Sequence, residues 1–208
     1  MTTIYLIRHG QSLGNAARVY LGHTDLDLSE LGFLQAKETA EKLSSVPFSA
    51  IYSSDLKRAM HTAEPHAKMR GMEVIPSSSL REMHVGEWEG ARIDDLQLDE
   101  RFTKGWRENF GNFTMPGGES VEGAANRIYE ALLDIAKKHD GETIAAVFHA
   151  GAMRAFWCKA LGIPKEEWAA RVPFPTNASY SVIECENGAF RTVCYSCDEH
   201  LTSVTKLP

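Results

Sequence analysis

Short apolar runs alternate with segments of helical period along most of this chain. The apolar runs are typical of buried strands, and they cover residues 3–7, 49–54, 72–76 and 143–148. Segments with apolar residues three or four positions apart are found at 29–44, 55–71, 120–141 and 152–162. Alternation of this kind predicts an α/β fold with a mainly parallel central sheet and helices on both faces. A hairpin expected at 179–196 adds an antiparallel margin to that sheet.

Two local features refine the expected helices. Ser29 is a candidate N-cap, because its hydroxyl can accept a hydrogen bond from the first turn of the helix that follows. The apolar face of this helix is expected to hold Leu31, Leu34, Ala36, Ala40 and Leu43. Pro65 lies inside the segment 55–71, where proline is expected to kink the helix or make it start afresh.

The regular alternation fails between Gly86 and Gly118. This segment contains two of the four tryptophans and three phenylalanines, and it ends in the letters MPGGES. We interpret residues 86–118 as an inserted cap segment that folds over one edge of the sheet. With 208 residues and no internal repeat or linker, the chain is expected to form one domain, residues 1–208, that carries this insertion.

Charge and hydropathy exclude several classes of partner. The formal net charge is −6 and no long basic run is present, so neither nucleic acid nor an anionic membrane surface is an expected partner. No segment approaches the roughly 18 apolar residues of a membrane span, and the first residues do not resemble a signal peptide. These observations make the cytoplasm the expected location, and they leave the oligomeric state open.

The four cysteines are expected to be reduced and structural. CYSC at 194–197 has no second C-x-x-C to complete a zinc ribbon, and no helical pattern follows it as in a thioredoxin-type motif. If the hairpin turns through two residues at 186–188, Cys185 and Cys194 are not directly opposed. No metal and no cofactor is predicted.

Charged and imidazole side chains follow three of the expected strands. Arg8 and His9 come directly after the first, Arg58 lies one helical turn beyond the second, and His149 follows the fourth. Because ligands of open parallel sheets bind beyond the carboxyl ends of the strands, these four side chains are expected to meet at one rim. Two guanidinium groups and two imidazoles form an anion site, and phosphate is the anion that arginine matches best. The glycines at 10, 14 and 22 would let backbone N–H groups approach its oxygens.

Each of these features has a simpler interpretation when it is taken alone. RHG can be a turn that contains a hydrogen-bonded histidine, Arg58 can be a surface cation, and HAG can hold a buried structural histidine. A metal site built on His9 and His149 is a further alternative, but the sequence offers neither H-x-H nor H-E-x-x-H. The occurrence of all four residues at three strand ends favours the anion site.

Five motifs carry a resemblance to a known family. LIRHGQSLGN, SSDLKRAMHTA, LREMHVGEWEG, PGGES and VFHAG stand in the order and spacing of the histidine phosphatase superfamily, in the branch of cofactor-dependent phosphoglycerate mutases and related phosphatases. The resemblance extends from Ile4 to the closing hairpin. It implies a three-layer α/β sandwich in which His9 carries a phosphoryl group as phosphohistidine. It also implies that Arg8, Arg58 and His149 bind that group and that Glu82 is the proton donor.

The resemblance implies further residues that line the substrate pocket. They are Gln11, Ser12, Asn15, Leu21, Gly22 and Ala150, in addition to Arg8, Arg58, Glu82 and His149. Ala150 departs from the family pattern, which often has glycine after this histidine. Its N–H can bind substrate only if the backbone there accepts a Cβ. The mechanism so implied needs neither a metal nor a cofactor.

The expected substrate is a small phosphorylated metabolite, and the expected reaction is hydrolysis of phosphomonoesters. The insertion carries four basic residues against seven acidic ones, which is a poor clamp for a phosphorylated sugar acid. GEWEG and PGGES also resemble the phosphatase members, and His84 and Arg92 are candidates for contacting the rest of the substrate. The alternative is a cofactor-dependent phosphoglycerate mutase. A catalytically silent phosphate-binding protein is a third possibility. Such a protein is expected to have lost at least one of four residues, and all four are present: His9, Arg58, Glu82 and His149.

Overall fold

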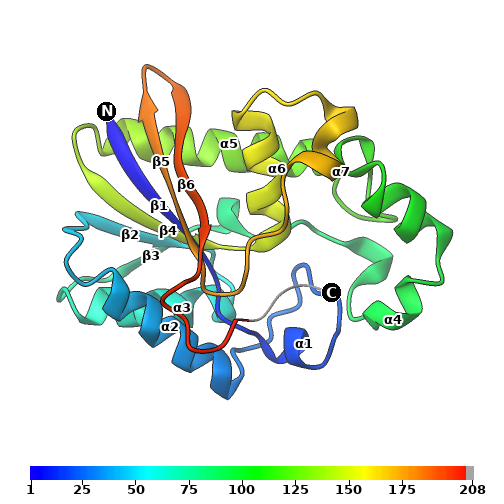
Figure 1. Ribbon diagram of the computed structural model, residues 1–208, viewed down its shortest axis with the longest axis horizontal. Helices are drawn as coiled ribbons and strands as arrows, with labels where there is room; N and C mark the ends of the chain where they lie inside the picture. Colours follow the sequence, from blue (N-terminus) through cyan, green and yellow to red (C-terminus); the bar gives the residue numbers. More distant parts are fainter. Residues whose placement is uncertain (205–208) are drawn as a thin grey trace.

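The centre of the protein is a sheet of six strands in the order β3-β2-β4-β1-β5-β6 (Figure 1). The computed structural model describes residues 1–204. The strands are β1 (Thr2–Arg8), β2 (Ala50–Ser53), β3 (Val74–Pro76), β4 (Thr143–Phe148), β5 (Tyr180–Glu186) and β6 (Ala189–Cys197). The first four run parallel, while β5 is antiparallel to β1 and β6 is antiparallel to β5. The mainly parallel sheet with an antiparallel margin is therefore confirmed.

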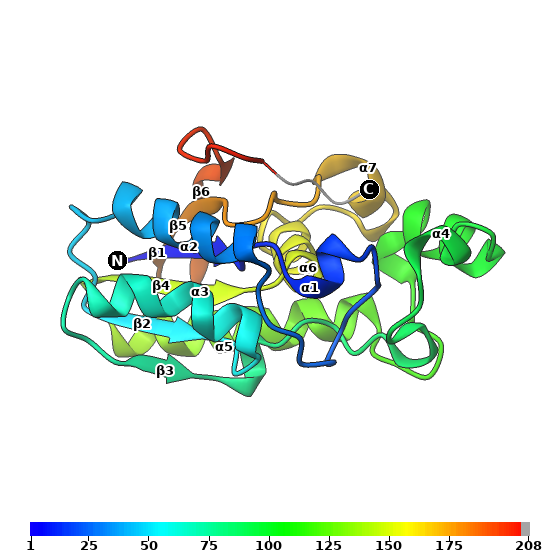
Figure 2. The same ribbon diagram turned by 90° about the horizontal axis from the view of Figure 1, so that it is seen from below.

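Helices cover both faces of this sheet and complete the three layers. In Figure 1 helices α5 (Val121–Lys138) and α6 (Ala150–Ala160) lie above the sheet, and α2 (Glu30–Lys42) and α3 (Lys57–Lys68) lie below it. Figure 2 shows α2 and α3 in front of the sheet. The remaining helices are short: α1 (Leu13–Ala16), α4 (Ile93–Leu96), α7 (Trp168–Arg171), a π-helical stretch at Arg101–Arg107, and 3₁₀ turns at Ser78–Leu80, Gly86–Trp88, Phe110–Asn112 and Lys165–Glu167.

The strands read as continuous apolar runs because both of their faces are buried. In β1, Ile4 and Leu6 join the large core under α5 and α6, whereas Ile7 joins a second core under α2 and α3. The same alternation holds in β4, where Ile144 and Val147 belong to different cores. Side chains of a strand point alternately to its two faces, so a strand between two helical layers needs apolar residues at every position.

The helices differ from expectation in three details. Ser29 caps α2 by accepting a hydrogen bond from the N–H of Gly32, but Leu34 is 47% exposed and lies outside the buried face. Helix α3 continues through Pro65 without a new start. Helix α6 begins at Ala150, directly after His149, rather than two residues later. This early start brings the amino end of α6 to the carboxyl end of β4.

The closing hairpin has the expected two-residue turn. Asn187 and Gly188 both have positive φ, and Glu186 pairs with Ala189 across the turn. Cys185 therefore faces Phe190 rather than Cys194, and all four cysteines are free thiols. Within residues 1–204, no helix is long and apolar enough to cross a membrane.

The insertion, residues 86–118, packs around its own aromatic side chains beyond the carboxyl ends of the strands (Figures 1 and 2). Trp88 stacks on Phe113 with ring centroids 5.4 Å apart, and Trp106 meets Phe110 edge to face at 4.8 Å. Trp88, Trp106 and Phe110 are buried and continuous with the large core. The segment thus covers the strand ends, not the open margin of an outer strand.

His66 of α3 makes the protein sensitive to acid. Its side chain is fully buried, and neither ring nitrogen has a hydrogen-bond partner in the described part of the chain. Burial, helped by the nearby charge of Arg70, lowers the pKa of His66 to about 3. The unfolded chain takes up a proton here below its ordinary pKa of about 6.5, while the folded protein does not, so stability falls as the pH drops through that range.

We expect His66→Leu to reduce this loss. Between about pH 6 and pH 4 the free energy of unfolding of the wild type should fall by about 1.4 kcal/mol per pH unit more than that of the variant. Urea unfolding at a series of pH values measures the difference. Parallel curves for the two proteins would show that His66 is protonated in the folded state.

Candidate active site

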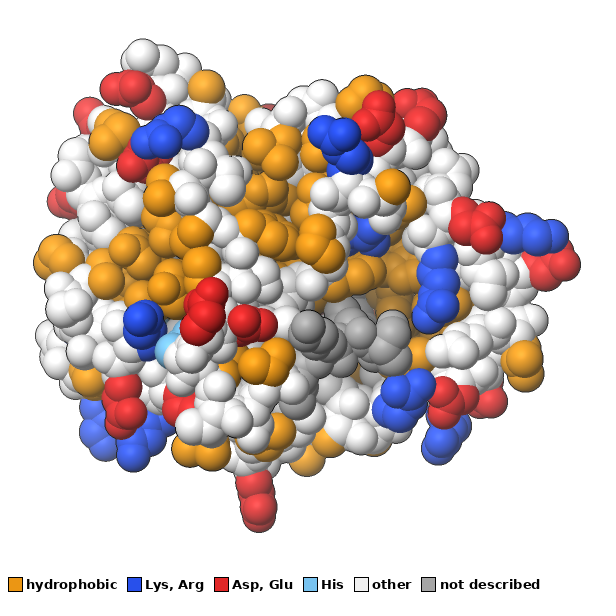
Figure 3. Space-filling model, in the orientation of Figure 1, with side chains coloured by type: hydrophobic (Ala, Val, Ile, Leu, Met, Phe, Trp, Pro, Cys, Tyr) orange, Lys and Arg blue, Asp and Glu red, His pale blue; other side chains and the backbone are white. Residues whose placement is uncertain are grey.

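A cavity of about 270 Å³ lies where the carboxyl ends of β1, β2 and β4 meet the insertion. Arg8 reaches it from the last position of β1, and His9 is the next residue. Arg58 comes from the first turn of α3, and Glu82 from the loop after β3. On the face shown in Figure 3 the surface is hollowed, with apolar side chains on the walls and Lys or Arg side chains beside them.

His9 is buried and its ring is held in one orientation. Its backbone N–H donates to Phe148 O at 3.0 Å, which continues the pairing of β1 with β4. The ring atom Nδ1 lies 2.7 Å from Gly10 O. Because a carbonyl oxygen can only accept, Nδ1 carries the proton, and Nε2 of the neutral ring keeps its lone pair.

The charges around His9 keep its ring neutral. Burial lowers the pKa of His9 well below the usual value of 6.5, and the positive charges of Arg58 and Arg8 lower it further. Burial disfavours the charged form of a histidine, and a nearby cation acts in the same direction. His9 therefore presents an unprotonated Nε2 at neutral pH.

Backbone carbonyls, not carboxylates, hold the two arginines. Arg8 donates from Nη1 to Pro175 O at 2.6 Å, and Arg58 donates to Thr24 O at 2.9 Å and Gly22 O at 2.8 Å. Each side chain is only 1% exposed. Burial lowers the pKa of Arg8 to about 10, so its guanidinium still carries its charge at neutral pH.

Two buried polar atoms beside His9 lack a partner within residues 1–204. They are Arg8 Nε and His149 Nδ1. His149 lies beside His9 with ring centroids 5.1 Å apart, and its other nitrogen, Nε2, is 2.8 Å from Ser54 Oγ. Burial and the charge of Arg58 lower the pKa of His149 well below its ordinary value. Arg8 lines the cavity, whereas His149 is fully buried beside His9 and is not one of the lining residues. Buried polar groups are normally bonded, so both atoms are candidates to donate to a polar ligand.

The carboxylate of Glu82 sits on the amino end of α6. Oε1 accepts from the N–H groups of Ala152 at 2.7 Å and Met83 at 2.9 Å, and Oε2 accepts from Gly151 at 2.9 Å. The free N–H groups and positive dipole of a helix start favour an anion there. A Cβ on Gly151 would stand 2.9 Å from Glu82 Oε1 and 2.5 Å from Met83 Cε, so a larger residue here would displace the ends of these two side chains.

Four of the other expected pocket residues line the cavity. They are Ser12, Asn15, Leu21 and Ala150. Ser12 and Asn15 form a reciprocal capping box at the start of α1, which fixes both side chains. Ala150 is the first residue of α6, a helical position that accepts a Cβ without strain.

Gln11 and Gly22 are not at the cavity. The side-chain oxygen of Gln11 accepts from Ser29 Oγ at 2.8 Å, behind the site. The N–H of Gly22 donates to Glu89 Oε1 at 2.9 Å, and that of Gly10 donates to Thr62 Oγ1 at 3.0 Å, so neither is open to a ligand. Their expected contact with substrate stays a prediction. Gly10 instead permits close packing, since a Cβ there would lie 2.4 Å from Gly32 O.

Comparison with protein families identifies the chain. The family model of the histidine phosphatase superfamily (branch 1) matches residues 4–198. The chain belongs to the histidine phosphatase superfamily. The family resemblance inferred from the five motifs is thereby confirmed.

Relatives within the superfamily carry both phosphatase and mutase names. Phosphoserine phosphatase 1 of Hydrogenobacter thermophilus is 36% identical over 189 residues, which are 89% of this chain and 88% of that protein. A probable phosphoglycerate mutase of Salmonella choleraesuis is 35% identical over 188 residues, 88% of this chain and 85% of that one. A mycobacterial glucosyl-3-phosphoglycerate phosphatase, solved with VO3, superposes with a TM-score of 0.87 at 28% identity and covers 94% of this chain and 99% of its own.

The structure of this superfamily member adds residues that the motifs did not reveal. Asn177 donates from Nδ2 to His9 O at 3.1 Å and to Asn15 Oδ1 at 3.2 Å. The N–H of Ala178, a residue with positive φ, donates to the same His9 carbonyl at 3.2 Å. The antiparallel hairpin expected at the end of the chain could have indicated these residues. The start of β5 lies beside the end of β1, so the residues before β5 reach the rim of the sheet.

Arg154 also lines the cavity and was missed. It stands four residues after Ala150, on the same face of α6. Its guanidinium donates to Val172 O and Ala169 O and lies 4.3 Å from the centre of the Phe110 ring. These bonds tie α6 to the end of α7.

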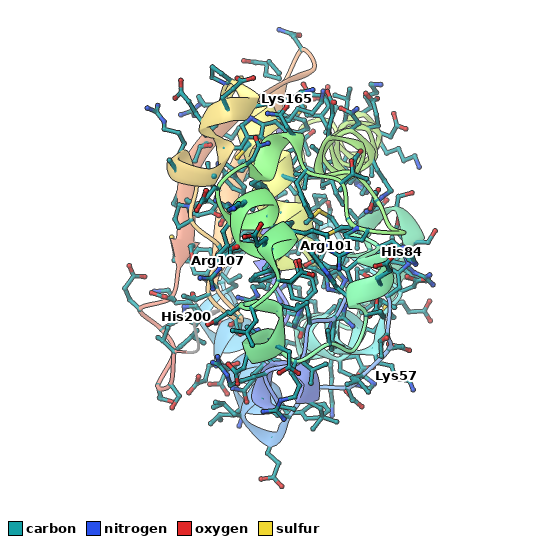
Figure 4. All side chains as sticks on the ribbon, turned by 90° about the vertical axis from the view of Figure 1, so that its right-hand side faces the viewer. Lys57, His84, Arg101, Arg107, Lys165 and His200 are labelled. Carbon is teal, nitrogen blue, oxygen red and sulfur yellow. The ribbon has the colours of Figure 1, made fainter. Side chains whose placement is uncertain are left out.

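The structure sorts the basic residues of the insertion into two groups. Arg101 and Lys104 form ion pairs with acidic neighbours, and Arg92 lies 3.9 Å from a carboxylate oxygen of Asp94. Arg107 lines the cavity and, among the described residues, has no carboxylate within ion-pair distance. Figure 4 shows Arg101 on the side of His84 and Arg107 on the opposite side. Neither His84 nor Arg92, the expected candidates, lines the cavity.

Within residues 1–204, no group of three His, Cys, Asp or Glu side chains is placed to hold a metal ion. His9 and His149 lie side by side. The carboxylate of Glu82, which would be the candidate third metal ligand, accepts hydrogen bonds from backbone N–H groups instead. The polar groups around the cavity are mainly donors, which suits an anion.

Proposed function

We propose that this protein hydrolyses small phosphomonoesters through a phosphohistidine at His9. The observation that carries the proposal is the tautomer of His9, since Nδ1–H is bonded to Gly10 O and the lone pair of Nε2 is left for attack. The charges of Arg58 and Arg8 act on the His9 ring, and His149 lies beside it with ring centroids 5.1 Å apart. A nucleophile in a donor-rich cavity is what phosphoryl transfer through a covalent intermediate requires.

The first step forms the N–P bond. Nε2 of His9 attacks phosphorus, the bond from phosphorus to the leaving oxygen breaks, and a proton on the Glu82 carboxyl passes to that oxygen. Glu82 Oε2 accepts one backbone hydrogen bond, so it keeps a position for this proton. In the second step water attacks phosphorus and gives a proton back to Glu82. The N–P bond breaks, and inorganic phosphate leaves with His9 neutral again.

Arg8, Arg58 and His149 bind the phosphoryl group in this proposal. The transition state of phosphoryl transfer is loose and spreads negative charge over three oxygens, so fixed cations and donors supply most of the stabilisation. For Nδ1 of His149 to donate, its Nε2 must accept from the Ser54 hydroxyl, which the 2.8 Å distance allows. Ser12, Asn15, Leu21 and Ala150 complete the proposed substrate contacts.

We propose that the insertion acts as a cap over the leaving group. Phe102 and Trp106 give the cavity an apolar wall, and Arg107, whose guanidinium lies 5.5 Å from the centre of the Phe102 ring, supplies one cation that has no carboxylate partner in the described part of the chain. A mutase has to retain its intermediate product and return the phosphoryl group to it, which a single cation at an open mouth does not favour. The relatives named as phosphatases support the same choice, and the mutase remains the alternative. The cytoplasmic location stays a prediction.

The phosphohistidine is directly testable. Rapid acid-free quenching during turnover of p-nitrophenyl phosphate should leave an acid-labile, base-stable phosphoryl group on His9, located by mass spectrometry. His9→Ala should lose the label and at least about 10³-fold in kcat, since the proposed N–P bond forms at His9. His139→Ala, at the amino end of β4, is the matched control and should keep both. Wild-type turnover by His9→Ala would refute the mechanism.

Glu82 should matter in proportion to the basicity of the leaving group. Glu82→Gln should reduce kcat on an alkyl phosphate by about 10²–10⁴-fold and much less on p-nitrophenyl phosphate, whose leaving group needs little protonation. Glu87→Gln is the control, because Glu87 is exposed and pairs with Arg101. Equal losses on both substrates would assign Glu82 a purely structural role.

One assay distinguishes phosphatase from mutase. The protein is supplied with 3-phosphoglycerate primed with 2,3-bisphosphoglycerate, and both 2-phosphoglycerate and free phosphate are followed. We expect release of phosphate to exceed interconversion, because Arg107 is the one basic residue of the insertion that lines the cavity among the residues described. Rapid interconversion with little phosphate would establish the mutase instead.

A further inference from the structure

The motif GEWEG contains a glutamate that the proposed reaction leaves without a role. This residue, Glu89, follows the 3₁₀ turn Gly86–Trp88 of the insertion. Its carboxylate accepts hydrogen bonds from three consecutive backbone N–H groups, those of Gly22 at 2.9 Å, His23 at 3.1 Å and Thr24 at 2.9 Å. The sequence separation is more than sixty residues, so one side chain of the insertion shapes a distant loop.

The same loop orients Arg58. Gly22 O accepts from Nη2 of Arg58 at 2.8 Å, and Thr24 O accepts from Nη1 at 2.9 Å. Residues 22–24 thus direct their N–H groups at the Glu89 carboxylate and two of their carbonyls at the Arg58 guanidinium. The peptide groups of residues 22–24 therefore lie between the Glu89 carboxylate and the Arg58 guanidinium. The negative charge of Glu89 strengthens the hydrogen bonds to Arg58, and the positive charge of Arg58 strengthens those to Glu89.

The loop also contacts Glu82. The Nε2 of His23 lies 2.9 Å from Glu82 O and donates to it, because a carbonyl oxygen only accepts. The loop that Glu89 holds therefore bonds to the proposed cation and to the backbone of the proposed acid.

Close packing fixes Glu89 against the loop. A Cβ on Gly22 would lie 2.9 Å from Glu89 Oε2 and 2.4 Å from Met83 O, so the approach depends on glycine. Tyr20 and the neighbours of Glu89 exchange two backbone bonds, Tyr20 N to Ala91 O at 2.8 Å and Gly90 N to Tyr20 O at 3.0 Å. These bonds fix the register of the insertion against the loop.

The carboxylate is charged in this setting. Burial alone would raise the pKa of Glu89, but the hydrogen bonds from Thr24 and Gly22 outweigh it and lower the pKa below its ordinary value. A charged acceptor bonded by three N–H groups holds them more strongly than a neutral one.

We propose that Glu89 is a positioning residue that sets the orientation of Arg58 toward the phosphoryl group through the loop of residues 22–24. The proposal rests on the proposed function only in taking Arg58 to bind the phosphoryl group. It excludes Glu89 as a substitute proton donor, because its carboxylate is already bonded to the loop. Because Glu89 belongs to the insertion, the insertion then helps to position the phosphate-binding Arg58 as well as covering the leaving group.

The test uses Glu89→Gln, which keeps the shape but removes the charge. Orthovanadate binding is measured by calorimetry, and kcat and KM are measured on p-nitrophenyl phosphate. We expect vanadate affinity to fall about 10-fold, as for loss of a charged hydrogen bond. Glu87→Gln, two residues away and exposed, should leave vanadate affinity and KM unchanged. Glu89→Asp, which keeps the charge on a shorter side chain, is the second variant and should bind vanadate with intermediate affinity.

A double-mutant cycle with Arg58→Ala separates positioning from general stability. If Glu89 acts through Arg58, then Glu89→Gln should weaken vanadate binding less than about twofold in the Arg58→Ala background. An undiminished 10-fold loss in that background would overturn the proposal, and so would unchanged vanadate binding in Arg58→Ala alone. Vanadate binding by a wild type that hydrolyses no phosphomonoester would refute the proposed function and leave this inference standing.

Discussion

Two buried positive charges, which have no carboxylate partner within residues 1–204, are the constraint on which the site depends. Arg8 and Arg58 are each 1% exposed, and their recorded partners are backbone carbonyl oxygens. Removing a guanidinium from water is costly, and neutral carbonyls offset only part of that cost. The charge therefore remains available to an anion. Burial and the charge of Arg58 hold the pKa values of His9 and His149 well below their usual range, and Arg8 adds to the effect on His9, so both imidazoles stay neutral beside the cations.

The sheet makes this concentration of donors possible. Strands β2, β4 and β1 are adjacent, so residues that follow them in sequence meet at one rim. The antiparallel β5 begins where β1 ends, which brings the loop before it, with Asn177, onto the carbonyl of His9. Helix α6 starts at the same rim and offers N–H groups, two of which hold Glu82. The Glu82 carboxyl group is thereby bonded to the helix start instead of to the arginines.

The sequence was sufficient wherever a residue's position follows from its own strand. Apolar runs buried on both faces predicted the sheet, and the residues after Ile7 and Phe148 reached the rim as expected. Prediction failed where a contact depends on two distant segments. Gly22 was expected to give its N–H to substrate, but Glu89 of the insertion occupies it. Leu34 follows the helical period of its segment and is nevertheless 47% exposed, since no layer covers that side of α2. The position of Arg154 at the cavity was not predicted, because the expected helix began at residue 152 whereas α6 begins at Ala150.

The insertion shows why net charge is a weak guide to a binding surface. Its seven acidic residues suggested that the insertion would repel the carboxylate of a phosphorylated sugar acid. In the structure, Asp99 and Glu100 pair with Arg101 and Lys104, and Asp94 pairs with Arg18, so much of that charge is neutralised away from the cavity. Glu89 points inward, but three N–H groups cover its carboxylate. Arg107 lines the cavity, and no carboxylate of residues 1–204 is within ion-pair distance of it. Selectivity for the leaving group therefore depends on a few inward side chains, of which one is basic and most are apolar.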